Sequence, residues 1–132
     1  MPYLLDTNTV SFILKGNARV RQHLVGVPME QVTLSVVTEA ELRFGLARRP
    51  EATRLRIAVE EFLLRVEILP WDSTAARSYA ELRAELERGG TSMGNLDMMI
   101  AAHALATRAV LVSSDRAFTK VKGLKVEDWT KP

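Results

Sequence analysis

The sequence predicts an α/β protein in which helices are layered against a central, mainly parallel sheet. Short apolar segments alternate with longer amphipathic ones, which is the order expected when helical crossovers join parallel strands. The chain shows no internal repeat and no low-complexity linker. Its 132 residues fit one domain and bury enough surface for a core, so residues 1–132 are expected to form a single domain.

Short apolar runs indicate the strands, and helical spacing with Gly or Pro stop signals indicates the helices. The strands are expected over residues 3–5, 32–35, 66–70 and 109–112, with a weak edge strand at 125–129. The helices are expected over residues 7–15, 17–25, 38–49, 51–65, 73–88 and 96–107. We expect Thr38 to open the third helix and to form a capping box with Glu41.

Composition excludes several classes of protein. Without cysteine there is no disulfide framework and no thiolate zinc site. A net charge of +2 and a pI near 9.2 permit a nucleic-acid partner without requiring one. The first residues lack the regions of a signal peptide, and no apolar stretch reaches membrane-spanning length. We therefore expect a cytoplasmic protein with no membrane partner.

Acidic residues follow the predicted strands. Asp6 ends the first strand, Glu41 lies in the helix after the second, and Asp115 follows the fourth. Functional sites of parallel sheets form at the carboxyl ends of the strands, so these three acids are expected at one edge. Asp97 opens the helix that leads into the fourth strand. It does not follow a strand, so this rule alone does not place it at the same edge.

Gathered carboxylates repel one another unless a cation lies between them, and oxygen ligands select Mg²⁺ or Mn²⁺. Each acid also has a purely structural explanation. Asp6 could cap the next helix, and Glu41 could complete the capping box. Asp97 could interact with the helix dipole, and Asp115 could form an Asx-type turn.

Helical geometry separates Glu39 from Glu41, because residues two apart point roughly 200° away from each other. Glu41 flanks the expected buried stripe of its helix and Glu39 points away from it; the stripe is formed by Val37, Ala40, Phe44 and Ala47. Leu42 and Leu46 then remain as spare apolar positions, which would favour a homodimer.

The histidine at position 103 and a cluster of arginines can each be explained in two ways. His103 lies in an alanine-rich helix, where a packing role is expected more often than a catalytic one. A basic cluster could contact phosphates or could simply form a solvated helix face; it consists of Arg48, Arg49, Arg54 and Arg56.

The order and spacing of five motifs resemble the PIN-domain family and, within it, the VapC-type toxins, including FitB-like members. The motifs are Leu4-Leu5-Asp6-Thr7-Asn8, the segment from Ser35 to Gly45, the segment from Gly94 to Ala104, the segment from Val112 to Phe118, and the tail from Gly123 to Trp129. The resemblance implies an α/β/α sandwich and Mg²⁺- or Mn²⁺-dependent hydrolysis of RNA, tRNA among the targets. It also implies a small VapB-like antitoxin as partner.

The resemblance places the family's acids on four residues of this chain, namely Asp6, Glu41, Asp97 and Asp115. Asn8, Ser35 and Ser113 match its supporting polar residues. Many members carry another acid just before the phenylalanine of the fourth motif, where this chain has Ala117. The fourth contact then falls to Asp115 alone.

Two alternatives remain open from the sequence. An aspartate-nucleophile phosphatase also begins with a strand that ends in aspartate, but it requires a second acid where this chain has Asn8. A PIN fold that binds RNA or protein without cleaving it would retain the shape, although retention of all four acids argues against it.

Overall fold

The computed structural model describes all residues 1–132 and contains a five-stranded sheet in the order β3-β2-β1-β4-β5. Every neighbouring pair of strands is parallel, which confirms the predicted sheet. The strands are β1 (Tyr3–Leu5), β2 (Val32–Ser35), β3 (Glu67–Leu69), β4 (Val110–Val112) and β5 (Val126–Glu127).

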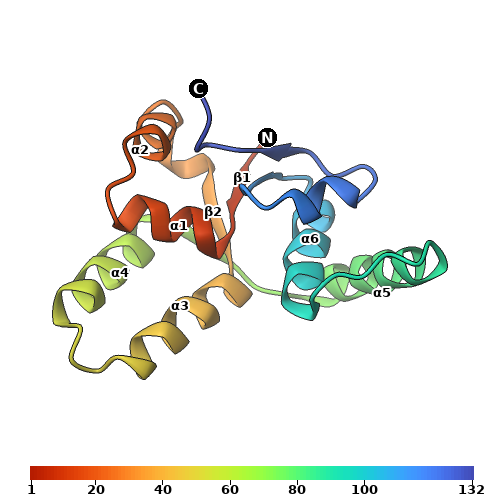
Figure 1. The fold of residues 1–132 in the computed structure, drawn as a ribbon, viewed down its shortest axis with the longest axis horizontal. Helices are drawn as coiled ribbons and strands as arrows, with labels where there is room; N and C mark the ends of the chain where they lie inside the picture. The colour runs from red at the N-terminus through yellow and green to blue at the C-terminus, as the bar shows by residue number, and fades with distance from the viewer.

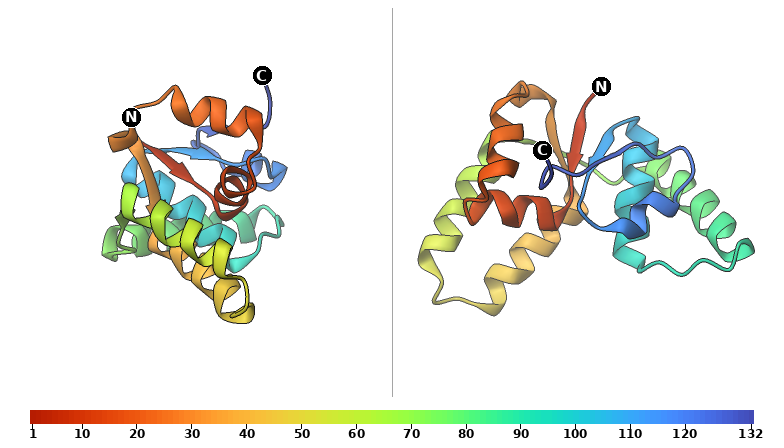
Figure 2. Two further views of the ribbon diagram at one scale, coloured as in Figure 1. Left: turned by 90° about the vertical axis from the view of Figure 1, so that its left-hand side faces the viewer. Right: turned by 45° about the horizontal axis from the view of Figure 1, so that its top comes forward.

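Six α-helices and two short 3₁₀ helices connect the strands. Helices α1, α2 and α4 lie on one side of the sheet, and α5 and α6 lie on the other (Figures 1 and 2). The α-helices are α1 (Thr7–Leu14), α2 (Ala18–Val25), α3 (Val36–Arg48), α4 (Thr53–Arg65), α5 (Ser73–Arg88) and α6 (Asn95–Thr107), and the 3₁₀ helices are η1 (Met29–Gln31) and η2 (Arg116–Lys120). None of the helices has the length and apolar character needed to cross a membrane.

Alternation along the short central strand divides the core into two clusters. Leu4 and Leu5 are both fully buried, but successive side chains of a strand point to opposite faces. Leu5 belongs to a cluster with apolar residues from α1 to α4, whereas Leu4 belongs to a cluster with residues of α5 and α6. The α/β/α layering therefore follows from a central strand that is apolar on both faces.

The third helix differs from the prediction in its start. Helix α3 begins at Val36, and Ser35 caps it by accepting a hydrogen bond from the Val37 amide at 3.1 Å. The expected capping box between Thr38 and Glu41 is therefore wrong. The hydroxyl of Ser35 already serves the first turn, and Glu41 bonds elsewhere.

The buried face of α3 also differs from the predicted stripe. Leu42 and Leu46 are 8% and 3% exposed and belong to the core, so they are not spare positions for an interface. Phe44 is 62% exposed, and Ala40 and Ala47 are exposed as well. The reason is that α3 faces the α1–α4 cluster through Leu42 and Leu46 and the α5–α6 cluster through Val37, so no single stripe describes it.

The C-terminal segment closes one end of the core. Strand β5 forms the edge beside β4, as expected, although it is only two residues long. Trp129 is 2% exposed and packs against the rings of Tyr3 and His23, at centroid distances of 5.5 Å and 5.7 Å. Both termini accordingly lie at the same end of the molecule (Figure 1).

We expect Leu46→Ala to lower the free energy of unfolding by about 2–5 kcal/mol, because it leaves a cavity in the core. Phe44→Ala on the same helix is the matched control and should cost only about 0.5 kcal/mol, since that ring is mostly exposed. Urea denaturation of both variants measures the difference. Equal losses would contradict the assignment of Leu42 and Leu46 to the core.

Candidate functional site

The sheet topology gathers three of the four predicted acids at one edge. Strands β1 and β4 are neighbours, with Leu5 opposite Val112, so both end at the same level. Asp6 and Ser113 come next, and the Asp6 amide bonds to the Val112 carbonyl at 3.1 Å. Helix α3, which carries Glu41, starts at the end of β2 on the other side of β1. The carboxyl edge is thus where Asp6, Glu41 and Asp115 meet.

Asp97 reaches the same edge from the opposite direction. It lies in the first turn of α6, and α6 leads back to the start of β4. A helix that returns to the beginning of a parallel strand has its own first turn near the strands' carboxyl ends. The crossover therefore places Asp97 at the edge where the other three acids lie.

Electrostatic coupling shows that the four carboxyl groups share one neighbourhood. Partial burial is the largest cause of a raised pKa of Asp97, and repulsion from Asp115, Glu41 and Asp6 raises this pKa further. No lysine or arginine neutralises the cluster, because the three ion pairs of the structure join Arg43 to Glu39, Arg43 to Glu60 and Arg83 to Glu87. The edge therefore concentrates uncompensated negative charge.

Backbone amides anchor two of the carboxylates and leave an oxygen of each free. Asp6 is 5% exposed, and its Oδ1 accepts from the Thr9 amide at 2.8 Å, which caps α1. Asp115 Oδ1 accepts from the Ala117 amide at 2.9 Å and caps η2. The structural roles proposed for these two acids are real, and they leave Oδ2 of each residue for a ligand.

The two glutamates of α3 point in different directions as predicted, although the stripe that was expected to place Glu41 is mostly exposed. Glu41 accepts a hydrogen bond from the Thr7 hydroxyl at 2.7 Å, which holds it beside Asp6 at the start of α1. Glu39 instead pairs with Arg43 at 2.9 Å on the surface of the same helix. Thr38, one turn before Glu41, is fully buried, and its hydroxyl has no hydrogen-bond partner.

The supporting residues matched from the sequence have different environments. Ser113 is buried and accepts from the Asp115 amide at 3.0 Å, so it fixes the turn that carries this acid. Ser35 is fully buried at the cap of α3. Asn8 is exposed in the first turn of α1, and its side chain makes no hydrogen bond. His103 is 1% exposed and therefore lies in the core.

The donor set is compatible with a hard divalent cation. All four side chains offer oxygen, the ligand that Mg²⁺ and Mn²⁺ prefer, and their mutual repulsion favours a cation between them. In the described conformation no three Asp, Glu or His side chains stand close enough together to hold an ion. Side-chain rotation would be needed for them to converge on a cation.

Two grooves flank α3 and both reach Glu41. The apolar groove has a volume of about 800 Å³ and is lined by Val36, Ala40, Phe44, Trp71, Leu96 and Met99, among others. The basic groove has a volume of about 320 Å³, runs between α1, α3 and α4, and carries Lys15, Arg48 and Arg49. Thr7, Glu41, Gly45 and Arg48 line both.

Sequence reasoning missed two hydroxyl residues of α1. Thr7 orients Glu41 from 34 positions away, and Thr9 donates to the Val112 carbonyl at 2.9 Å, which ties α1 to β4. No local pattern reveals such contacts. The available signal was the position of both residues directly after Asp6, where a helix starts at the edge of the sheet.

Comparison with known proteins identifies the family. The profile of the PIN domain matches residues 3–124. The tRNA(fMet)-specific endonuclease VapC of Salmonella typhimurium is 34% identical over 130 residues, which cover 98% of this chain and 98% of that protein. The ribonuclease VapC2 of Rickettsia felis is 30% identical over 134 residues, which cover 99% of this chain and 100% of that protein.

Solved structures agree with this assignment. The crystal structure of VapBC2 from Rickettsia felis, bound to a DNA fragment from its promoter, matches with a TM-score of 0.91 and 30% identity over 98% of this chain and 99% of that chain. FitAcB from Neisseria gonorrhoeae matches with a TM-score of 0.88 and 29% identity over 98% and 99%. The chain belongs to the PIN-domain family and, within it, to the VapC ribonucleases.

Proposed function

We propose that this chain is a divalent-metal-dependent endoribonuclease that cleaves tRNA and acts as the toxin of a toxin–antitoxin pair. One observation carries the proposal: Asp97 is electrostatically coupled to Asp6, Glu41 and Asp115, and no cationic side chain neutralises them. The tRNA(fMet)-specific VapC relative supports tRNA as the substrate. This function requires the compartment that holds tRNA, which is the cytoplasm.

The four carboxylates would hold Mg²⁺, with Mn²⁺ as a substitute. Such an ion, when bound, lowers the pKa of a water molecule and neutralises charge on a phosphate. The chain itself positions the ligands. Thr7 directs one oxygen of Glu41 by its hydrogen bond, and Ser113 fixes the turn of Asp115. Asn8, which is exposed in the first turn of α1, would contact the RNA.

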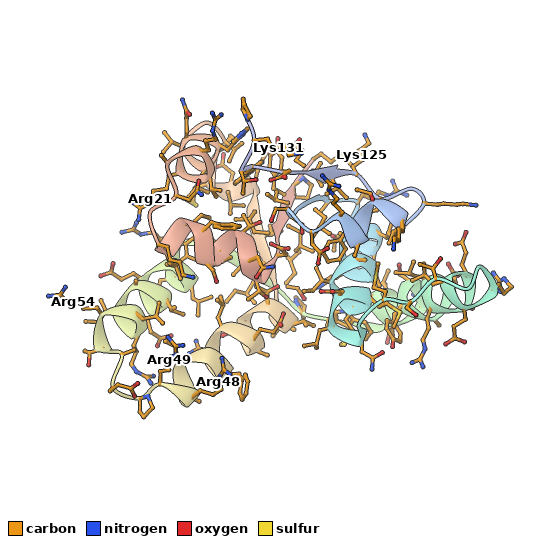
Figure 3. All side chains as sticks on the ribbon, in the orientation of Figure 1. Arg21, Arg48, Arg49, Arg54, Lys125 and Lys131 are labelled. Atoms are coloured by element: carbon orange, nitrogen blue, oxygen red, sulfur yellow. The ribbon has the colours of Figure 1, made fainter.

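The basic groove supplies a path for the phosphates of the substrate. Lys15, Arg48 and Arg49 line it, and none of the three forms an ion pair. Glu41 and Arg48 are seven residues apart on α3, a rise of roughly 10 Å. Arg48 and Arg49 lie near the tip of the α3–α4 hairpin, whereas Arg54 projects from the outer side of α4 (Figure 3). A strand of RNA in this groove would reach the carboxylates with its backbone partly neutralised.

Two protein partners fit the remaining surfaces. A VapB-like antitoxin is supported by the solved complexes, which pair VapC with VapB and FitB with FitA. A second copy of the chain is our proposed occupant of the apolar groove, whose walls expose Val36, Phe44 and Leu96 by 38%, 62% and 48%. Such exposure beside a site is typical of an interface.

We expect Glu41→Gln to reduce single-turnover tRNA cleavage in Mn²⁺ at least about a hundredfold, which corresponds to about 2.7 kcal/mol. Glu39→Gln is the matched control and should change the rate less than about threefold, because it breaks only an exposed ion pair. EDTA should stop the wild type. Tight tRNA binding with no cleavage by the wild type would instead identify a non-catalytic binding module.

Asp97→Asn should abolish cleavage and raise the Tm of the metal-free chain. The folded pKa of Asp97 is raised, so between its unfolded value of 3.8 and the raised value the folded state binds more protons than the unfolded chain. Stability from this group is therefore present at low pH and is lost as the pH rises through that window. Calorimetry at pH 4 and pH 7 measures the effect. A Tm that falls at pH 7 on substitution would contradict the repulsion.

Replacing Arg48 and Arg49 together by alanine should weaken tRNA binding and flatten its salt dependence. Each lost contact to a single-strand phosphate lowers the slope of log K against log salt by about 0.7. Binding is measured by anisotropy in the Glu41→Gln background, which prevents cleavage. Arg88→Ala, at the exposed end of α5, is the control. An unchanged slope in the double variant would place the RNA elsewhere.

For the dimer, light scattering at micromolar concentration should give twice the chain mass. Phe44→Asp should give monomer, because it puts a charge inside the apolar groove. Leu64→Asp is the control, since Leu64 is 87% exposed on α4 and lines neither groove. A wild-type monomer would rule out this interface.

A further inference from the structure

A buried polar contact lies behind the carboxylates, between the helices that carry Glu41 and Asp97. His103 Nδ1 is 2.8 Å from Ser35 Oγ, and the two residues are 1% and 0% exposed. Ser35 Oγ already accepts from the Val37 amide, so its own proton is available to Nδ1. The neutral ring then carries its proton on Nε2, which the nearby carbonyl of Pro70 can accept.

Three segments of the fold meet at His103. His103 lies in α6, Ser35 joins β2 to α3, and Pro70 follows β3. A second bond supports the same junction, because Trp71 Nε1 donates to the Met99 carbonyl of α6 at 3.1 Å. The segment after β3 and the cap of α3 are therefore both attached to α6, within two turns of Asp97.

The remaining contacts of α6 give little directional control. Its other buried side chains are apolar, namely Met98, Ile100, Ala101, Ala102 and Ala104, and apolar contact has no preferred direction. Asp97, at the start of α6, is meanwhile repelled by Glu41 on α3. A directional contact between the two helices is needed to hold them in register, and His103 with Ser35 is the buried side-chain bond that joins them.

We propose that His103 is a positioning residue, whose buried hydrogen bond to Ser35 fixes α6 against α3 and so sets how well Asp97 and Glu41 converge on one cation. The proposal rests on the function proposed above. It assigns His103 no contact with the substrate or with the metal. Its effect is transmitted along α6, where His103 lies six positions after Asp97.

The test is the Kd for Mn²⁺ of the full chain, measured by electron paramagnetic resonance without RNA. We expect His103→Leu to raise this Kd about tenfold, and Ser35→Ala to raise it similarly, because each removes the same bond from one side. His103→Asn keeps a polar atom near the position of Nδ1 and should recover most of the affinity. Ile100→Val, also buried on α6, should lower the Tm without changing the Kd.

The outcomes separate this proposal from the proposed function. If Glu41→Gln abolishes Mn²⁺ binding but folded His103→Leu and Ser35→Ala bind normally, His103 does not position the site and the metal site stands. If Glu41→Gln also binds normally, the metal site itself is wrong. Should His103→Leu not fold, His103→Phe decides, because it keeps a buried ring and leaves the cap of α3 intact: a Kd equal to that of the wild type overturns the proposal, and a tenfold rise supports it. A loss of affinity in Ile100→Val matching its loss of Tm would reduce His103 to a packing role.

Discussion

Repulsion among four carboxyl groups is the constraint around which this structure is arranged. Asp6, Glu41, Asp97 and Asp115 come from separate parts of the chain, and the parallel sheet with its crossover helices brings them to one edge. Packing elsewhere must therefore offset an unfavourable electrostatic contact. Two fully apolar clusters on either face of the sheet provide this stability, so the site can remain uncompensated without unfolding the chain.

Helix α3 belongs at once to the carboxylate cluster, to both grooves and to both core clusters. It carries Glu41, it forms one wall of both grooves, and it contributes to both core clusters. The basic groove lies toward α4 and the apolar groove lies toward α6. An occupant of either groove would therefore contact the helix that holds a carboxylate of the site. This arrangement lets a protein partner and a nucleic acid affect the same side chain from opposite sides.

Much of the fold and most of the site could be predicted from local patterns. Strands of three or four apolar residues and well-marked helix ends located the elements, and the rule for parallel sheets placed Asp6 and Asp115 together. The surroundings of α3 could not be predicted. Leu42 and Leu46 do not follow a single stripe because the helix is buried on two sides, and the role of Thr7 is not visible in the sequence because its bond to Glu41 depends on tertiary structure. Contacts between distant segments have no signature in sequence spacing.

The central strand β1 pairs with β4, which lies near the other end of the chain. The sheet can therefore be completed only late in synthesis. Strand β1 is made first, yet Tyr3 pairs with Val110, and the Thr9 hydroxyl bonds to the Val112 carbonyl. Domains form as the nascent chain emerges, but here the middle of the sheet has one open edge until the segment around β4 has left the ribosome. Asp115 emerges later still. A ribosome making this chain is thus not exposed to a finished nuclease while most of the polypeptide is still being translated.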